Sequence, residues 1–325
     1  MVKRLIYYIC AAQITIVIVV CINIYYKKNA DVGNYNVLGK ESISSNASSK
    51  LRHFYEPKPN SVEVVNLKWL GQEYDYNVTY NINSDSLNQF PNYIPEKEKD
   101  TIRIITVGDS FTFGTNVNTK DNYPSQLQNI LNTNCLDHSY EVINLGVAGY
   151  DMQYVIERMK LRGVKYNPDI VVWFLITDDF LRFSEKLIPL AKEIGPTLRK
   201  TKEYDRLLKE GIYYPSWYIA KKQIIKDLGG EQEALRLQQK YISDIDKYYT
   251  NKLVFSFYPK FQKKYRNILE QIVDKRPKTY INPNMRDIYE LDGGLPDKHP
   301  NEKGYKIMAE DVFKYLKENK LIPCN

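Results

Sequence analysis

The chain has 325 residues, of which 43% are hydrophobic and 26% are charged. These values are typical of a globular protein and exclude wholesale disorder, a collagen-like repeat and a protein with many membrane spans. The 46 Lys and Arg residues exceed the 39 Asp and Glu residues to give a net charge of +7, which is too small and too dispersed for a dedicated nucleic-acid binder. The three His and four Cys residues form no close-spaced group, so we expect no zinc or other metal site.

The first predicted element is a membrane-spanning helix. Residues 5–26 contain no charged side chain, and a helix of about 20 apolar residues crosses a hydrocarbon layer of about 30 Å. Tyr residues near both ends of this run are typical of membrane interfaces, and no small-residue cleavage site follows it. We therefore expect residues 1–28 to form a single-pass signal-anchor, with the rest of the chain outside the cytoplasm. A cleaved signal peptide is the alternative.

The next two segments connect this helix to the main domain. Residues 29–60 are rich in Ser, Asn and Gly, which predicts a solvated polar tether. In residues 74–83, apolar and polar residues alternate, which is typical of a strand with one buried face. Together with the Val-rich residues 62–65 upstream, this pattern predicts a small β-ribbon in an extension over residues 61–100, with a structural role.

The main domain is predicted over residues 101–325, where strand and helix signals alternate. This alternation favours an α/β fold with a doubly wound, mostly parallel sheet. Residues 180–251 contain no convincing strand, so we expect a helical insertion near the carboxyl edge of the sheet, whose role as a lid, a docking surface or a scaffold stays open. The strand signals lie at residues 102–107, 140–144, 170–176, 252–258 and 279–281, and the helix signals at 123–131, 152–164, 261–275 and 301–318.

Two segments place small or polar residues directly after a predicted strand. The sequence GDSFTFG at residues 108–114 holds Ser110 in a turn, where its hydroxyl and its own backbone N–H can be exposed. The sequence NLGVAGYD at residues 144–151 holds Gly residues, whose backbone N–H groups can approach a developing negative charge.

A third segment, DKHPNEKG at residues 297–304, precedes the last predicted helix. It places His299 next to an acid and near a helix N-terminus. His53 lies in the tether and His138 in a polar loop, which leaves His299 as the only plausible general base.

In this order, the three segments resemble the blocks of the SGNH/GDSL hydrolase family, in particular a membrane-anchored, single-pass branch. The resemblance extends from residue 101 to the C-terminus. It implies a flavodoxin-like, three-layer α/β/α sandwich, and ester hydrolysis or acyl transfer through an acyl-serine without any cofactor. It also implies that Ser110 is the nucleophile, His299 the base and Asp297 the orienting acid, and that the N–H groups of Ser110 and Gly149 form the oxyanion hole.

Two positions differ from the usual family pattern. The acid usually stands three residues before the His, where this chain has Pro296, whereas Asp297 stands two before it. A Ser-His dyad, or help from Asp292, therefore remain as alternatives.

The second difference is Asp178, which occupies the position of the Asn that normally donates to the oxyanion. An ionised carboxylate there would repel the developing charge. It would contribute to the oxyanion hole only if it were protonated, through burial or through a like-charged neighbour such as Asp179.

The fold that the resemblance implies also brings two Cys residues together. Its first and last helices lie side by side in the same direction, and Cys135 and Cys324 follow their C-terminal ends. Outside the cytoplasm these residues could form a disulfide.

The preferred function is that of a membrane-anchored serine esterase of the cell envelope that removes O-acyl, in particular acetyl, groups from an envelope or extracellular glycan, or from a small ester. An O-acyltransferase, supplied by a membrane-bound acyl donor protein, is the first alternative. A catalytically weak or inactive envelope-binding protein is the second. The acyl chain, the acceptor and the oligomeric state stay open.

Overall fold

The computed structural model describes residues 43–44, 48–67, 76–212, 214–258 and 260–324. The predicted membrane helix at residues 5–26 and most of the predicted tether lie outside this part of the chain. Among the described residues, no helix combines the length and the apolar character that a membrane span requires.

The centre of the fold is a five-stranded parallel sheet with the strand order β6-β5-β7-β8-β9. The middle strand, β7, reads IVVWFL and is buried at every position, as expected for a parallel strand that is covered on both faces. The predicted α/β fold with a parallel sheet is confirmed. The strands are β5 (Thr101–Val107), β6 (Ser139–Asn144), β7 (Ile170–Leu175), β8 (Lys252–Phe257) and β9 (Thr279–Asn282).

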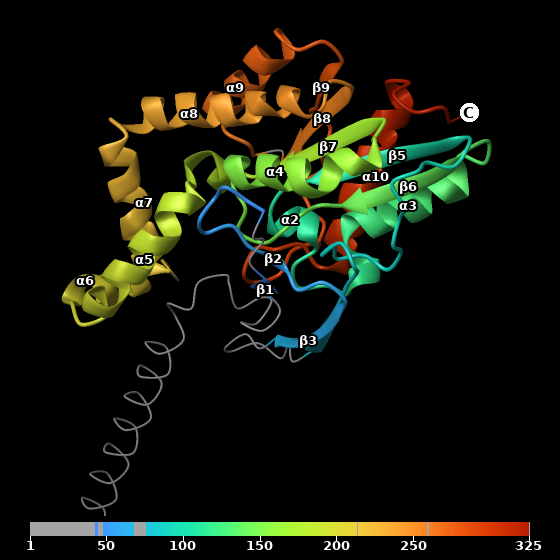
Figure 1. Ribbon diagram of the computed structural model, residues 1–325. Helices are drawn as coiled ribbons and strands as arrows, with labels where there is room; N and C mark the ends of the chain where they lie inside the picture. Colours follow the sequence, from blue (N-terminus) through green and yellow to red (C-terminus); the bar gives the residue numbers. More distant parts are fainter. Residues whose placement is uncertain (1–42, 45–47, 68–75, 213, 259, 325) are drawn as a thin grey trace, which may run out of the picture.

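Helices cover both faces of this sheet and form the three layers seen in Figure 1. Helices α3 (Tyr123–Asn134) and α10 (Glu302–Glu318) pack their Leu127, Leu131, Val312 and Leu316 side chains on one face. On the other face lie α4 (Met152–Arg158), α8 (Glu231–Ser243) and α9 (Lys263–Val273). The helix signal at residues 152–164 is not one regular helix, because α4 continues into the π-turn η4 (Met159–Gly163) and the 3-10 turn η5 (Val164–Tyr166).

The region after β7 is helical, as the sequence predicts. It contains η6 (Thr177–Leu181), α5 (Ser184–Leu198), α6 (Lys202–Lys209), α7 (Pro215–Asp227), α8 and η7 (Asp244–Lys247). Helices α5, α6 and α7 extend away from the sheet (Figure 1). This insertion has its own small core, to which α5, α7 and α8 contribute buried Leu187, Ile224 and Ala234.

The region before the sheet contains two small antiparallel pairs, β1 (Ile43–Ser44) with β2 (Glu56–Pro57), and β3 (Ser61–Leu67) with β4 (Tyr76–Ile82). In β4, the alternating residues Val78, Tyr80 and Ile82 are buried and pack on Phe113, as the period of two predicts.

The expectation of a solvated tether up to residue 60 is wrong for its last part. Phe54, Tyr55 and Glu56 are buried against the main domain. Glu56 is 1% exposed and forms ion pairs with Arg158 and Arg162. The pattern of polar residues did not show this, because a buried carboxylate needs distant arginines that a local reading does not connect.

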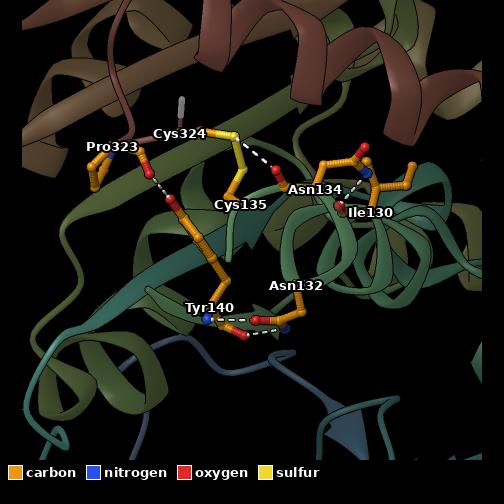
Figure 2. Close-up of a disulfide and its surroundings, with 7 residues drawn as sticks. All are labelled: Ile130, Asn132, Asn134, Cys135, Tyr140, Pro323 and Cys324. Carbon is orange, nitrogen blue, oxygen red and sulfur yellow. Dashed lines mark hydrogen bonds between the residues drawn. A yellow bond between two sulfur atoms is a disulfide. The ribbon is translucent and has the colours of Figure 1, made fainter. Parts of the chain in front are cut away.

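A disulfide joins Cys135 and Cys324, which are 189 residues apart in the sequence and have Cα atoms 4.8 Å apart. Figure 2 shows the bond beside Tyr140, whose hydroxyl donates to the carbonyl oxygen of Pro323. Helices α3 and α10 pack along each other and bring their C-terminal ends together. The expected pairing is therefore confirmed.

The two remaining short helical elements of the described chain are α2 (Ser110–Phe113) and η3 (Thr119–Asp121).

Candidate active site

Ser110 stands at the first position of α2, directly after β5. The turn depends on Gly108, whose φ of +151° is unfavourable for other residues. A Cβ atom at this position would also lie only 2.7 Å from the carbonyl oxygen of Phe174. Asp109 is the N-cap of α2, since its Oδ1 accepts a hydrogen bond of 2.9 Å from the N–H of Phe111. The turn therefore holds Ser110 in place at the carboxyl edge of the sheet.

The structure brings Ser110, His299 and Asp297 into one series of hydrogen bonds. His299 Nε2 lies 2.9 Å from Ser110 Oγ, and His299 Nδ1 lies 2.9 Å from Asp297 Oδ2. The backbone N–H of His299 also donates to Asp297 Oδ1 at 3.1 Å. With Nδ1 as the donor to the carboxylate, Nε2 is free to accept the proton of the serine hydroxyl.

Asp297 rather than Asp292 is the acid that contacts the imidazole. Burial favours its neutral form, but the hydrogen bonds and charge of His299, with a hydrogen bond from Asn116, hold the pKa of Asp297 below its usual value. The amide of Asn116 donates to Asp297 Oδ2 at 2.6 Å. The carboxylate is therefore ionised and held from two sides. Asn116 was not identified from the sequence, since only the folded chain brings it to residue 297.

The start of α10 fixes the position of His299. Asn301 is the N-cap of this helix and accepts from the N–H of Gly304 at 2.9 Å, while the carbonyl of His299 accepts from the N–H of Leu295 at 2.8 Å. From the first turn of α10, the hydroxyl of Tyr305 donates to the carbonyl of Thr115 at 3.1 Å. These contacts join the loop that carries the imidazole to the loop that follows the nucleophile.

The other two His residues lie elsewhere. The ring of His138 is near the carbonyl oxygen of Asp100, at 3.3 Å. The backbone N–H of His53 donates to Glu185 Oε2 at 3.1 Å. Of the three His residues, His299 is the one that contacts the hydroxyl of Ser110, which also lies 3.2 Å from Asp109 Oδ2.

Two backbone N–H groups are available as oxyanion donors. Within the described part of the chain, the N–H groups of Ser110 and Gly149 donate to no protein acceptor. Gly149 has a φ of +82°, a conformation that suits glycine. This arrangement agrees with the role that the resemblance implies for both residues, which remains a prediction.

Tyr55 sets the orientation of the peptide that carries the Gly149 N–H. Its hydroxyl donates to the carbonyl of Ala148 at 2.6 Å. Because a trans peptide is planar, with its C=O and N–H pointing in opposite directions, this bond turns the Gly149 N–H away from Tyr55. Tyr55 precedes the main domain and carries no motif, so this role could not be predicted from the sequence.

Asp178 does not meet the condition for an oxyanion donor. It forms ion pairs with Arg182, at 2.6 Å, and with Lys221 of α7, at 2.7 Å. Although partial burial opposes ionisation, these two cations hold the pKa of Asp178 well below its usual value. The condition under which Asp178 would contribute to the oxyanion hole, a protonated carboxyl, is therefore not favoured here, because an ionised carboxylate has no proton to donate.

The neighbouring Asp179 behaves in the opposite way. It is 3% exposed, and burial together with the nearby carboxylate of Asp109 raises its pKa well above the usual value. Its Oδ2 accepts from the N–H of Ile176 at 3.0 Å. At this strand end, burial thus disfavours the charged form of Asp179, whose contact to the backbone of Ile176 holds the turn after β7.

A hydroxyl, an imidazole and a carboxylate in series at the edge of a parallel sheet are the arrangement of serine hydrolases. A family model described as GDSL-like Lipase/Acylhydrolase matches residues 104–312. The chain belongs to this family, since the match covers more than half of its length.

Individual relatives are distant. The acetylxylan esterase of Xylanibacter ruminicola is 26% identical over 240 residues, which cover 69% of this chain and 45% of that protein. The chain thus spans less than half the length of this curated relative. Among solved structures, TesA has a TM-score of 0.44 and 16% identity, covering 68% of this chain and 99% of the other. A family 3 carbohydrate esterase of Clostridium thermocellum has a TM-score of 0.40 and 18% identity, covering 67% and 96%.

Proposed function

We propose that this chain is a carboxylic ester hydrolase that is anchored in a membrane and removes O-acetyl groups from an envelope or extracellular glycan. The observation that carries the chemistry is the series of hydrogen bonds from Ser110 through His299 to Asp297, with two distances of 2.9 Å. Both lie within the range of about 2.6 to 3.2 Å that proton transfer requires.

The reaction follows from this geometry. Ser110 Oγ attacks the acetyl carbonyl carbon while His299 Nε2 takes the hydroxyl proton, and the N–H groups of Ser110 and Gly149 bind the resulting oxyanion. The imidazolium then gives its proton to the leaving sugar oxygen, which leaves an acetyl-serine. Water attacks this ester with His299 as the base again, and acetate is released. Asp297 stabilises the imidazolium in both steps.

One exposed tyrosine near the site supports a sugar as the substrate. The ring of Phe111 lies 5.4 Å from that of His299, and Tyr258 lies 5.2 Å from Phe111 and 5.9 Å from Tyr289. Tyr289 is 43% exposed. Its hydroxyl donates to the carbonyl of Lys298, the residue before His299, so the exposed part of the ring offers an apolar surface to an incoming sugar near the catalytic base. The acetylated substrate in the name of the Xylanibacter ruminicola relative also supports this class.

Two features support a location outside the cytoplasm. The Cys135–Cys324 disulfide is of a kind that persists in oxidising compartments. The uncharged run at residues 5–26 has the length and flanking residues of a signal-anchor. An O-acyltransferase that uses the same residues, with an acyl donor protein in the membrane, is the second candidate.

Product analysis with the full-length protein tests these proposals. We expect the wild type to release free acetate from 4-nitrophenyl acetate and from acetylated xylan oligosaccharides, and Ser110→Ala and His299→Ala to release neither above background. Acetylated glycan that accumulates in the presence of an acetyl donor, with little free acetate, would favour the transferase. Hydrolysis of the aryl ester alone would contradict the glycan substrate while leaving the esterase chemistry intact.

A further inference from the structure

We propose that Arg182 is a catalytic residue of this esterase, whose guanidinium donates to the substrate carbonyl oxygen where related enzymes use a neutral amide. The inference concerns ester hydrolysis itself, so it does not depend on whether the natural substrate is a glycan. It assigns a function to the side of the oxyanion hole that the ionised Asp178 leaves without a donor.

The position of Arg182 next to Gly149 carries this proposal. A Cβ built on Gly149 would lie 3.9 Å from Arg182 Nη1. The side chain of Arg182 is 14% exposed, so it lies largely within the protein but reaches its surface. Gly149 is the residue whose N–H is available for the oxyanion, so Arg182 Nη1 lies beside the residue that carries one of the two backbone donors.

Asp178 holds one side of the guanidinium and leaves the other side available. Arg182 Nη2 donates to Asp178 Oδ2 at 2.6 Å. Among the described residues, no hydrogen bond of Nη1 to a protein acceptor is found. The second cation at Asp178, Lys221, binds the other carboxylate oxygen, Oδ1, at 2.7 Å. The carboxylate is thus neutralised from both sides and orients Arg182 without leaving a net negative charge at the site.

The electrostatics of the neighbouring groups are consistent with this position. Burial raises the pKa of Asp109, and the hydrogen bond from Phe111 followed by the charges of Arg182 and His299 oppose that shift. Asp109 directly precedes Ser110, so the guanidinium and the imidazole both act on the turn that carries the nucleophile. Arg182 therefore lies near the reacting atoms and does not form a remote surface ion pair.

The proposed step is balanced without any further reactant. As the bond between Ser110 Oγ and the carbonyl carbon forms, the π electron pair moves to the carbonyl oxygen, and the serine proton moves to His299. Arg182 Nη1–H donates to that oxygen, beside the N–H groups of Ser110 and Gly149. The negative charge is lost again when the carbonyl re-forms and the alkoxide leaves. A donor with a full positive charge binds the oxyanion more strongly than the neutral ester.

Kinetics of the full-length protein on 4-nitrophenyl acetate test the proposal. We expect Arg182→Ala to lower kcat by about 10²- to 10³-fold with little change in KM, as for loss of one oxyanion donor. Arg206→Ala is the matched control, because among the described residues this arginine of α6 forms its ion pairs with Glu203 and Glu210 of the same helical segment, and it is 56% exposed. It should keep the wild-type kcat.

A double variant separates catalysis from a structural role. In Arg182→Ala, the carboxylate of Asp178 keeps only Lys221 and repels the oxyanion, whereas Asp178→Asn removes that charge and supplies an amide donor. We therefore expect Asp178→Asn combined with Arg182→Ala to recover at least tenfold in kcat over Arg182→Ala. A purely structural ion pair predicts a further loss instead. The proposal is overturned if Arg182→Ala keeps kcat within about threefold of the wild type, or if the double variant is slower than Arg182→Ala while its far-ultraviolet circular dichroism is unchanged.

Discussion

The two sides of the active site are built in different ways. The side that carries Ser110 and His299 consists of short segments in which the functional residue and its cap are sequence neighbours, such as Asp109 next to Ser110. The side that carries the oxyanion donors depends on residues far apart, where Tyr55 holds the Ala148 carbonyl from 93 positions away. Motifs therefore predict the side that transfers the proton, with Ser110 and His299, whereas the side that binds the oxyanion becomes visible only in the folded protein.

The largest effect is expected at the proton-transfer side. Asp297→Asn replaces an acceptor by an amide and disfavours the tautomer in which His299 Nδ1 is the donor, so kcat on 4-nitrophenyl acetate should fall by about 10²- to 10⁴-fold. The release of 4-nitrophenol, followed in a continuous or a stopped assay, measures this fall in kcat. Asp292→Asn is the matched control, since within the described part of the chain no hydrogen bond joins the side chain of Asp292 to Ser110 or His299. If both substitutions had the same small effect, Asp297 would have no special role.

A smaller effect is expected on the oxyanion side from Tyr55→Phe. This change removes only the hydroxyl that fixes the peptide between Ala148 and Gly149, and one such hydrogen bond is worth about 1 kcal/mol, or about fivefold in rate. We expect the loss in kcat with KM unchanged. Tyr93→Phe removes a hydroxyl that bonds to Gln128 at 2.5 Å, away from the site, and should leave kcat unaltered. An equal loss in both variants would show that Tyr55 contributes only to stability.

Removal of the disulfide tests whether the segments that carry Ser110 and His299 are held in place by their own contacts. Cys135→Ser combined with Cys324→Ser should lower the free energy of unfolding by about 2 to 4 kcal/mol. The kcat should not change, because Tyr305 and Asn301 hold the start of α10 independently of its end. Chemical denaturation of both proteins under non-reducing conditions measures the first quantity. A parallel fall in kcat at low temperature would mean that the bond positions His299.

The smallest effect concerns the pH dependence of stability. The pKa of Asp297 lies below its usual value, so the carboxylate stabilises the folded protein above the unfolded-state pKa of about 3.9, and this contribution is lost as the pH falls through the folded-state pKa. The difference in free energy of unfolding between wild type and Asp297→Asn should be constant near neutral pH and shrink below about pH 4. A difference that grows in acid would contradict this sign.

The sequence predicts the sheet and the Ser110–His299 contact because both depend on local patterns. Each strand of the sheet is a short apolar run, and the residues after β5 and before α10 lie at the same edge in any such fold. It does not predict that residues 54–56 are buried, because Glu56 needs Arg158 and Arg162 to be stable there. It also does not predict the ionisation of Asp178, since two cations, one of them from α7, decide whether that carboxylate is charged.

The covalent link between Cys135 and Cys324 makes the chain behave as a closed ring over most of the main domain. The long helical insertion at residues 180–251 lies within that ring, whereas Ser110 lies before it. A protease that cuts the insertion once would therefore leave the nucleophile and the imidazole in one molecule, and the two fragments would separate on a gel only after treatment with a reductant.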